Sequence, residues 1–267
     1  MSHSFELEKI TKIIERYNLK AKKSLSQNFL FDLNLSDRIV NSMGEINNYD
    51  VLEIGPGPGS LTRSLLNLGA RKVTVIEKDS QFLEPLEEIK RLFPDRLTII
   101  HGDIMLTDLT PLLTPPIKVI SNLPYNIGTQ ILLKFIATKI WPPFWDSLTL
   151  MFQKEVAERV VSPPRSKSYG RLSIISQWRS QVDVSFHVNP SAFIPPPKVN
   201  SSIVHFVPLK KPRFPACQVT LEGIVKLAFS KRRKMLRQSL KALDVDIIKV
   251  LTILDIDPTC RPEELSI

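Results

Sequence analysis

Hydrophobic positions in the first two thirds of the chain form short runs that alternate with amphipathic stretches. Five runs rich in β-branched residues predict strands at 51–55, 73–77, 97–101, 117–121 and 148–153. The spacing of apolar residues between them predicts helices at 60–68, 80–92 and 129–138. Strand–helix alternation of this kind predicts a parallel, Rossmann-like sheet with right-handed crossovers.

The pattern changes in the last third of the chain. Two runs, 182–188 and 201–207, predict strands, and the proline-rich stretch between them is incompatible with a helix. We therefore expect an antiparallel pair that closes the sheet. Residues 219–254 predict helix, with an apolar stripe made of Leu221, Ile224, Val225, Ala228, Leu236, Leu240 and Leu243. The expected organisation is an α/β domain over 1–207, a linker over 208–215 and a small all-α domain over 216–267.

Composition narrows the class of partner. The 267 residues carry 36 Lys and Arg against 27 Asp and Glu, a net charge of +9 that favours nucleic acid or an anionic membrane surface. No apolar run approaches the roughly 20 residues of a membrane span, and the N-terminus lacks a secretory hydrophobic segment. We therefore expect a cytoplasmic protein. Two cysteines without a CxxC motif, and four scattered histidines, predict neither a disulfide framework nor a metal site.

A glycine-rich turn follows the first predicted strand and indicates a nucleotide site. Glycine at positions 55, 57 and 59 permits positive φ and lets backbone N–H groups approach a ligand. Glu77 ends the second strand, where a carboxylate can bind both hydroxyls of a ribose. The third glycine comes one residue earlier than in the GxGxxG turn of nicotinamide enzymes, and Glu53 precedes the turn. Both details favour an S-adenosylmethionine pocket at Gly55 and Gly57.

Two more polar residues follow predicted strands. Asp103 comes after the third strand, and Asn122 after the fourth. Open α/β sheets bind ligands at the carboxyl ends of their parallel strands, so these side chains are candidates for the same pocket. Asp103 can accept a hydrogen bond from an adenine amino group, although a helix-capping role is an equally good interpretation.

The stretch SNLPYNIG at 121–128 is either a simple turn or a reactive loop, because Asn-x-Pro is common in turns. An adenine amino group is a poor nucleophile, and two acceptors on its N–H groups would favour its more nucleophilic, pyramidal form. Asn122 Oδ1 and the carbonyl of Leu123 are candidate acceptors, and Pro124 stiffens the loop. Tyr125 offers a face on which an extruded base can stack.

Basic residues are concentrated near the C-terminus, and no acidic residue interrupts them between Gly223 and Asp244. The group consists of Lys226, Lys231, Arg232, Arg233, Lys234, Arg237 and Lys241. Such a run is commonly a solvated helix face, but opposite an apolar stripe it indicates a helix that contacts RNA phosphates. Lys22 and Lys23 are candidates for a second basic patch beside the donor pocket.

Several motifs together resemble the small-subunit rRNA adenine dimethyltransferases, the KsgA/RsmA family. They are SLSQNFL (24–30), VLEIGPGPGSLT (51–62), VIEKD (75–79), GDIM (102–105), SNLPYNIG (121–128), MFQKEVAERV (151–160), YGRLSIISQ (169–177), FIPPPKVNSSIV (193–204) and FSKRRKMLRQSL (229–240). The resemblance spans about residues 20 to 240 and implies a class I methyltransferase fold.

The resemblance also implies an activity and a set of residues. We expect S-adenosylmethionine-dependent N6,N6-dimethylation of two adjacent adenosines near the 3′ end of small-subunit rRNA. The reaction would need no metal, and the enzyme would act as a monomer on an immature 30S particle. The implied S-adenosylmethionine contacts are Asn28, Leu30, the Gly55 turn, Glu77, Asp103 and Asn122. Phe193 would face Tyr125 across the flipped base, whereas the sequence alone equally supports a core position for Phe193.

Three alternative functions share part of this pattern. A large-subunit rRNA adenine methyltransferase of the macrolide-resistance type would share the donor pocket and the NLPY loop, but FIPPPKVNSS and RRKMLRQSL favour the small-subunit assignment. A non-enzymatic RNA-binding assembly factor would keep only a vestigial pocket. A nicotinamide oxidoreductase is disfavoured by the glycine spacing.

Overall fold

A computed structural model describes residues 8–231 and 234–267, and the chain divides into two compact units. The first unit comprises residues 1–157 and 183–208, and the second comprises 158–182 and 209–267. The division differs from the expected domains over 158–182, which pack with the C-terminal helices. The expected linker is fixed within the second unit, because the N–H of Leu209 donates to Arg179 and that of Arg213 to Trp178.

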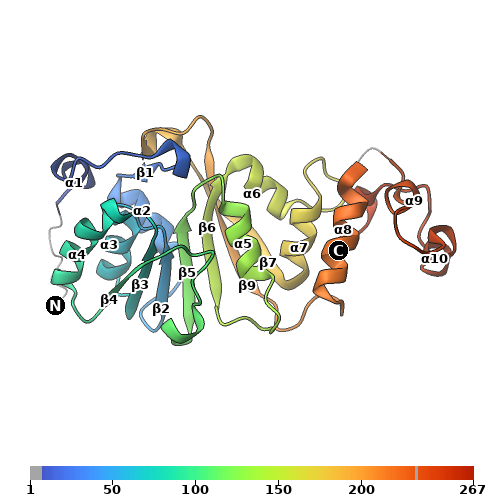
Figure 1. Ribbon diagram of the computed structural model, residues 1–267, viewed down its shortest axis with the longest axis horizontal. Helices are drawn as coiled ribbons and strands as arrows, with labels where there is room; N and C mark the ends of the chain where they lie inside the picture. The colour runs from blue at the N-terminus through green and yellow to red at the C-terminus, as the bar shows by residue number, and fades with distance from the viewer. Residues whose placement is uncertain (1–7, 232–233) are drawn as a thin grey trace. The chain divides into compact units, whose positions relative to one another are not determined.

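Within the described residues, a seven-stranded sheet has the order β4-β3-β2-β5-β6-β9-β7 (Figure 1). The strands are β2 (Asp50–Ile54), β3 (Lys72–Glu77), β4 (Leu97–His101), β5 (Ile117–Asn122), β6 (Ser147–Gln153), β7 (Ser180–Val188) and β9 (Ser201–Pro208). β2 to β6 pair in parallel, and β9 runs antiparallel to β6. The predicted strands and the antiparallel closing strand are confirmed, and every strand begins and ends within two residues of its prediction.

The predicted helices of the first unit are also present, but other elements were not expected. The predicted ones are α3 (Ser60–Asn67), η2 (Ser80–Phe82) with α4 (Leu83–Leu92), and α5 (Gly128–Ile136). The unexpected ones are α1 (Ile10–Arg16), α2 (Leu33–Asn41), α6 (Lys154–Val161), α7 (Arg171–Arg179) and the paired short strands β1 (Phe29–Leu30) and β8 (Phe193–Ile194). Helix α2 begins where the carboxylate of Asp32 accepts the N–H of Asn34 at 2.9 Å.

The core of the first unit holds the carboxyl ends of the strands in fixed positions. Val51, Val73 and Ile120 of the central strands are fully buried. They cluster with Leu65 of α3 and Leu86 of α4, which bury the apolar faces of those helices. A close-packed platform of this kind fixes the loops that follow the strands.

Residues 219–254 contain helices, as predicted, but the apolar stripe expected to continue through them is not carried by one helix. The second unit instead contains α8 (Gln218–Ala228), η5 (Phe229–Lys231), α9 (Leu236–Ser239) and α10 (Ile247–Ile253). Met235 is extended (ψ 150°) just before α9, and the carboxylate of Asp246 caps α10. The predicted apolar stripe is divided, because Val225 packs with Tyr169 whereas Leu236 packs in a separate cluster.

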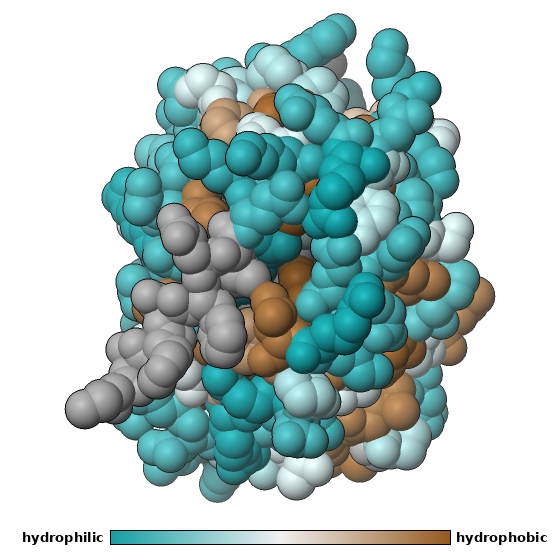
Figure 2. All heavy atoms as spheres, turned by 90° about the vertical axis from the view of Figure 1, so that its left-hand side faces the viewer, coloured by the Kyte–Doolittle hydropathy of each residue, from teal (hydrophilic) through white to brown (hydrophobic). Residues whose placement is uncertain are grey.

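One face of the first unit is mostly hydrophilic (Figure 2). Viewed from the left-hand side of Figure 1, most side chains are hydrophilic, with hydrophobic patches between them (Figure 2). Within the described parts of the chain, none of the helices has the length and apolar content that a bilayer crossing requires.

Candidate active site

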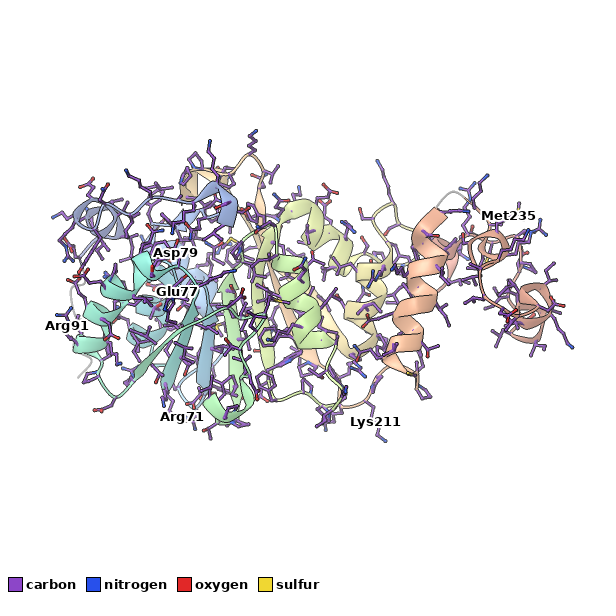
Figure 3. The ribbon with its side chains drawn as sticks, in the orientation of Figure 1. Arg71, Glu77, Asp79, Arg91, Lys211 and Met235 are labelled. Carbon is purple, nitrogen blue, oxygen red and sulfur yellow. The ribbon has the colours of Figure 1, made fainter. Side chains whose placement is uncertain are left out.

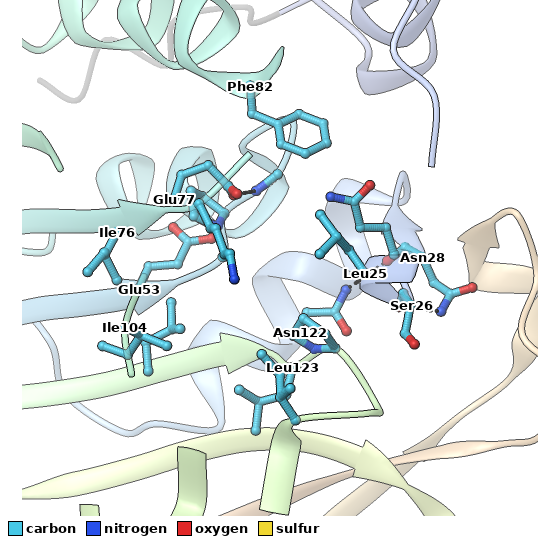
Figure 4. Close-up of a pocket in the computed structure, with 18 of the residues that line it drawn as sticks. Leu25, Ser26, Asn28, Glu53, Ile76, Glu77, Phe82, Ile104, Asn122 and Leu123 are labelled. Carbon is cyan, nitrogen blue, oxygen red and sulfur yellow. Dashed lines mark hydrogen bonds between the residues drawn. The ribbon is translucent and has the colours of Figure 1, made fainter. Parts of the chain in front are cut away.

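A cavity of about 330 Å³ lies at the carboxyl ends of β2, β3, β4 and β5 (Figure 4). Its lining comes from five stretches of chain, within residues 24–30, 53–61, 76–82, 102–104 and 122–131. The volume is in the range of small-molecule sites, and the position is the one where open α/β sheets bind ligands. The strand-end residues expected to share a pocket therefore do so.

The glycine-rich turn forms one wall of this cavity. Gly55, Gly57 and Gly59 have φ values of 63°, 55° and 89°, a left-handed conformation that side chains other than glycine rarely adopt. A Cβ added at Gly55 would meet no protein atom within 4 Å. The backbone N–H of Gly57 donates a hydrogen bond to Glu77 Oε2 at 3.1 Å. The turn is thus fixed by β3 and keeps open space at Gly55.

Glu77, the last residue of β3, is buried and anchored by the backbone. Its Oε1 accepts the N–H of Asp79 at 2.7 Å, and its Oε2 accepts that of Gly57. Burial raises the pKa of Glu77, and these hydrogen bonds oppose that shift. Each carboxylate oxygen retains a lone pair, as binding of two ribose hydroxyls requires. Figure 3 shows Glu77 and Asp79 together, with Arg71 at the other end of the strand.

Asp103 is held by a lysine that the sequence analysis did not single out. Lys78 Nζ donates to Asp103 Oδ2 at 2.8 Å, and the N–H of Met105 donates to Oδ1 at 2.9 Å. The hydrogen bond from Lys78 is the main cause of a lowered pKa of Asp103. Both side chains line the cavity, so an ionised carboxylate with a fixed orientation faces a ligand there.

The NLPY loop is a turn and also borders the cavity. The carbonyl of Pro124 accepts the N–H groups of Ile127 and Gly128, which closes the turn. Asn122 ends β5, and its Nδ2 donates to the carbonyl of Asn28 at 3.0 Å, so Oδ1 is not the atom used for this bond. Tyr125 is half-buried, and its hydroxyl shares a 2.6 Å hydrogen bond with Ser201.

A third carboxyl group of the cavity, Glu53, is fully buried. It accepts a 2.6 Å hydrogen bond from the hydroxyl of Thr62 on α3. Burial raises the pKa of Glu53 to about 8, and the bond from Thr62 opposes the shift. Near neutral pH this side chain is therefore largely protonated, a property that the motif gave no reason to expect.

These features fit an adenosyl methyl donor. The carboxylate of Glu77 can accept hydrogen bonds from ribose hydroxyls, and that of Asp103 can accept one from an adenine amino group. Phe82 and Ile104 provide apolar walls for a purine. Among the side chains that the structure describes, no three of His, Cys, Asp or Glu are grouped as metal ligands would be.

Comparison with known proteins identifies the family. A sequence model of the ribosomal RNA adenine dimethylase family matches residues 18–259. The chain belongs to this family. A relative named ribosomal RNA small subunit methyltransferase A, from Ruegeria sp., is 50% identical over 267 residues, which are 100% of this chain and 95% of the relative. The protein of the same name from Paracoccus denitrificans is 49% identical, over 98% of this chain and 93% of the relative.

Solved structures agree on the fold. A dimethyladenosine transferase from Plasmodium falciparum is similar with a TM-score of 0.74 and 27% identity, over 88% of this chain and 92% of that one. The 23S rRNA methyltransferase ErmE gives a TM-score of 0.65 and 25% identity, over 89% and 96%. The class I methyltransferase fold and the methyltransferase class predicted from the sequence are confirmed, and family and fold imply S-adenosylmethionine as the donor.

Phe193 does not line this cavity. It pairs with Leu30 across the two-stranded β1–β8 sheet, and only 2% of it is exposed, within the main core. Its position is therefore that of a core anchor, and it would have to become exposed to stack on a base opposite Tyr125. Leu30 itself lines the cavity, and its carbonyl accepts the hydroxyl of Ser60.

The predicted basic RNA-contacting helix is not a single helix in this dimethylase. Lys231 ends η5, Lys234 follows in a bend and Arg237 lies in α9. Lys231 and Lys234 are exposed, whereas Arg237 is half-buried and donates to Met235 Sδ at 3.4 Å. Two further predicted contacts, Arg232 and Arg233, lie outside the described residues.

The predicted N-terminal patch contains one lysine that is already paired. Lys22 Nζ donates to the buried carboxylate of Asp79 at 2.7 Å, while Lys23 is exposed. Gln27 Nε2 donates to the same carboxylate at 3.0 Å. Gln27 and Lys78 also line the site, and the sequence predicted neither, although they lie in the motifs SLSQNFL and VIEKD directly beside the predicted contacts Asn28 and Glu77.

Proposed function

We propose that this chain transfers methyl groups from S-adenosylmethionine to the N6 atoms of two adjacent adenosines near the 3′ end of small-subunit rRNA. The products would be N6,N6-dimethyladenosines, made during ribosome biogenesis in the cytoplasm. The observation that carries the proposal is full-length identity of about 50% with several proteins named ribosomal RNA small subunit methyltransferase A. A cavity with the NLPY loop at one side and the glycine-rich turn at another supports it.

Donor binding would use the polar groups at the strand ends. Glu77 accepts hydrogen bonds from the ribose hydroxyls, and Asp103 accepts one from the adenine amino group of the donor. The Gly55–Gly57 turn leaves room for the rest of the molecule, with Asn28 and Leu30 on the facing segment. When bound, S-adenosylmethionine supplies an activated methyl group on its sulfonium.

The NLPY loop would prepare the target amine. Asn122 Oδ1 and the carbonyl of Leu123 accept its two N–H groups, which localises the nitrogen lone pair toward the donor. Pro124 keeps these acceptors in place, and the ring of Tyr125 stacks on the extruded base, with Phe193 on its other face once that ring is exposed. The N6 nitrogen attacks the methyl carbon, the carbon–sulfur bond breaks and S-adenosylhomocysteine leaves as a neutral thioether. The methylated nitrogen is then strongly acidic, so its proton passes to solvent without a dedicated base.

RNA would be held by charge and shape. The proposed phosphate contacts are Lys23, Lys231, Arg232, Arg233, Lys234 and Arg237. Lys22, the other basic residue expected to bind RNA, is paired with Asp79. The ammonium and guanidinium groups of the proposed contacts would bind rRNA in an immature 30S particle with an affinity that falls steeply with salt. The acting species would be a monomer.

An assay with isolated ribosomal particles tests this function. Purified protein and methyl-labelled S-adenosylmethionine are incubated with 30S precursors from a strain that lacks the modification, and separately with 23S rRNA. Mass spectrometry of the digested RNA should find dimethyladenosine in 16S rRNA alone, and Asn122→Ala protein is the catalytic control.

Two other results would replace the proposal. Methylation of 23S rRNA alone would favour the large-subunit alternative, for which the likeness to ErmE is the supporting observation. Protein that binds both the donor and the precursors yet transfers nothing would be a non-enzymatic assembly factor.

A further inference from the structure

The carboxylate of Asp79 is the centre of a buried hydrogen-bond network. Its side chain is only 1% exposed. It accepts from Lys22 Nζ at 2.7 Å, from Gln27 Nε2 at 3.0 Å and from Gln81 Nε2 at 2.7 Å. Lys22 is the only one of these donors that carries a charge, so it alone neutralises the buried carboxylate within this network.

This network connects the N-terminal segment of residues 20–27 to residues 79–81, which follow β3. The amide of Gln81 accepts the N–H of Lys20 at 3.1 Å and donates to its carbonyl at 3.2 Å. Gln27 Oε1 accepts the N–H of Lys22 at 2.8 Å, which closes the segment on itself. Both ends of the segment from Lys20 to Gln27 are therefore tied to one short loop.

The fastened segment continues directly into the active site. Residues 24–30 form one wall of the cavity. The carbonyl of Asn28, one residue beyond Gln27, accepts the amide of Asn122. A displacement of this segment would therefore change the donor cavity and free the Asn122 side chain to rotate.

We propose that Lys22, with Asp79 and Gln27, positions the N-terminal wall of the donor cavity, so that Lys22 acts as a positioning residue for donor binding and not as an RNA contact. The inference rests on the proposed function, since it takes S-adenosylmethionine as the ligand of that cavity. Burial opposes ionisation of Asp79, but the hydrogen bonds from Lys22, Gln27 and Gln81 outweigh it and lower the pKa of Asp79. This charge assistance makes the bond from Lys22 stronger than one between neutral groups.

The neighbouring lysine provides a matched control. Lys22 and Lys23 are adjacent and both exposed, with 51% of the Lys22 side chain accessible to solvent, but only Lys22 donates to Asp79. If both lysines served only to attract RNA, Lys22→Met and Lys23→Met would weaken RNA binding equally and leave donor binding alone. The positioning role predicts that only the change at Lys22 affects the donor.

The experiment measures donor binding by the full chain. Calorimetric titration with S-adenosylmethionine should give a dissociation constant about tenfold weaker for Lys22→Met, the loss expected for one charge-assisted hydrogen bond. Lys23→Met should lie within about twofold of wild type, and Lys22→Arg should restore most of the affinity. In turnover with 30S precursors, Lys22→Met should raise KM for the donor by a larger factor than it lowers kcat at saturating donor, because bound donor holds the displaced wall in place.

Amide hydrogen exchange provides a readout without any ligand. Amides of residues 24–30 should exchange faster in Lys22→Met and remain at the wild-type rate in Lys23→Met. A Lys22→Met protein with wild-type exchange and wild-type donor affinity would overturn the inference. Wild-type protein that binds no S-adenosylmethionine would overturn the proposed function and this inference with it.

Discussion

The side chain of Asn122 donates a 3.0 Å hydrogen bond to the backbone carbonyl of Asn28, 94 residues earlier in the chain. This bond joins the end of β5 to the N-terminal wall of the cavity (Figure 4). Because Nδ2 donates this bond, the side-chain amide of Asn122 cannot flip by 180° without losing it. Oδ1 therefore remains available as the acceptor for a ligand. The contact therefore decides which end of Asn122 is presented to an incoming amine.

Replacing Asn122 tests its role as an acceptor. Asn122→Ala should lower kcat for transfer to 30S precursors by about 10²–10³-fold, the usual cost of one preorganised polar group at a reacting centre. Affinity for RNA should change less than about twofold, as measured by filter binding. Asn122→Asp should be as inactive, since a carboxylate cannot donate to Asn28 and would repel its carbonyl. An active Asn122→Asp protein would contradict this account of the amide.

The ion pair of Lys78 and Asp103 should set the pH dependence of donor binding. Lys78 lowers the pKa of Asp103, so the carboxylate remains ionised to lower pH than an ordinary aspartate. In Lys78→Met that pKa rises, and the acid limit of S-adenosylmethionine binding should move to higher pH. Calorimetry over a range that extends below the ordinary aspartate pKa of 3.8, from about pH 3 to about pH 6, measures the shift. Lys134, which also lowers the pKa of Asp103, remains in the variant, so the shift should be partial.

A second ion pair at the opposite end of the sheet is the control for that experiment. Arg71 and Asp50 are 2.8 Å apart, the same distance as Lys78 and Asp103, and are likewise a partly exposed pair, with side-chain exposures of 46% and 14% against 62% and 23%. Arg71→Met should leave donor binding and its pH dependence unchanged. If both variants behave alike, the Lys78 pair is only an exposed salt bridge.

Glu53 should make the protein less stable as the pH rises. Its folded pKa of about 8 lies above the ordinary value of 4.5, so the folded state holds a proton that the unfolded state releases between these limits. Stability is therefore lost from about pH 4.5 to about pH 8. Glu53→Gln accepts the same hydrogen bond from Thr62 but never ionises. Its Tm should exceed that of wild type by a margin that grows across this range.

Thermal melts from pH 5 to pH 9 measure that margin. Glu77 also has a raised pKa and contributes in the same direction in both proteins, and because its charge helps to raise the pKa of Glu53, the margin includes the interaction of the two carboxyl groups. The exposed change Glu84→Gln should give a curve parallel to wild type. A constant difference between Glu53→Gln and wild type would show that Glu53 is ionised throughout.

The sequence was sufficient for the sheet and for the strand-end residues because each depends on a local pattern. Runs of β-branched residues marked β2 to β6, and parallel strands necessarily bring their carboxyl ends to one edge. Glu77, Asp103 and Asn122 could therefore be assigned to one pocket. The predicted turn at Pro124 was likewise local, since proline limits its own φ.

What could not be predicted depends on contacts between distant segments. The pairing of Lys22 with Asp79 joins residues 57 apart, and neither motif indicates that one serves the other. Phe193 is buried because β8 pairs with β1, and both strands have only two residues, too short for a period to be recognised. The division of the C-terminal helical region followed from two separate hydrophobic clusters, whereas helix periodicity alone could not distinguish them.

The glycines of the first turn should differ in what they contribute. Gly55 and Gly59 both have positive φ, so alanine at either position should cost about 1–2 kcal/mol of backbone strain. At Gly59 the new methyl group would also lie 2.5 Å from Ile89 Cδ1, and overpacking should add about 1–3 kcal/mol. At Gly55 it would meet no protein atom within 4 Å but would take up space beside the donor cavity.

Urea unfolding and donor titration separate the two effects. Gly59→Ala should lose more stability than Gly55→Ala, whereas Gly55→Ala should lose more affinity for S-adenosylmethionine relative to its change in stability. Gly223→Ala is the control, because it lies within α8, has no atom within 4 Å of the added Cβ and should gain up to about 1 kcal/mol. Equal losses of donor affinity at positions 55 and 59 would mean that the turn acts on the donor only through its overall conformation.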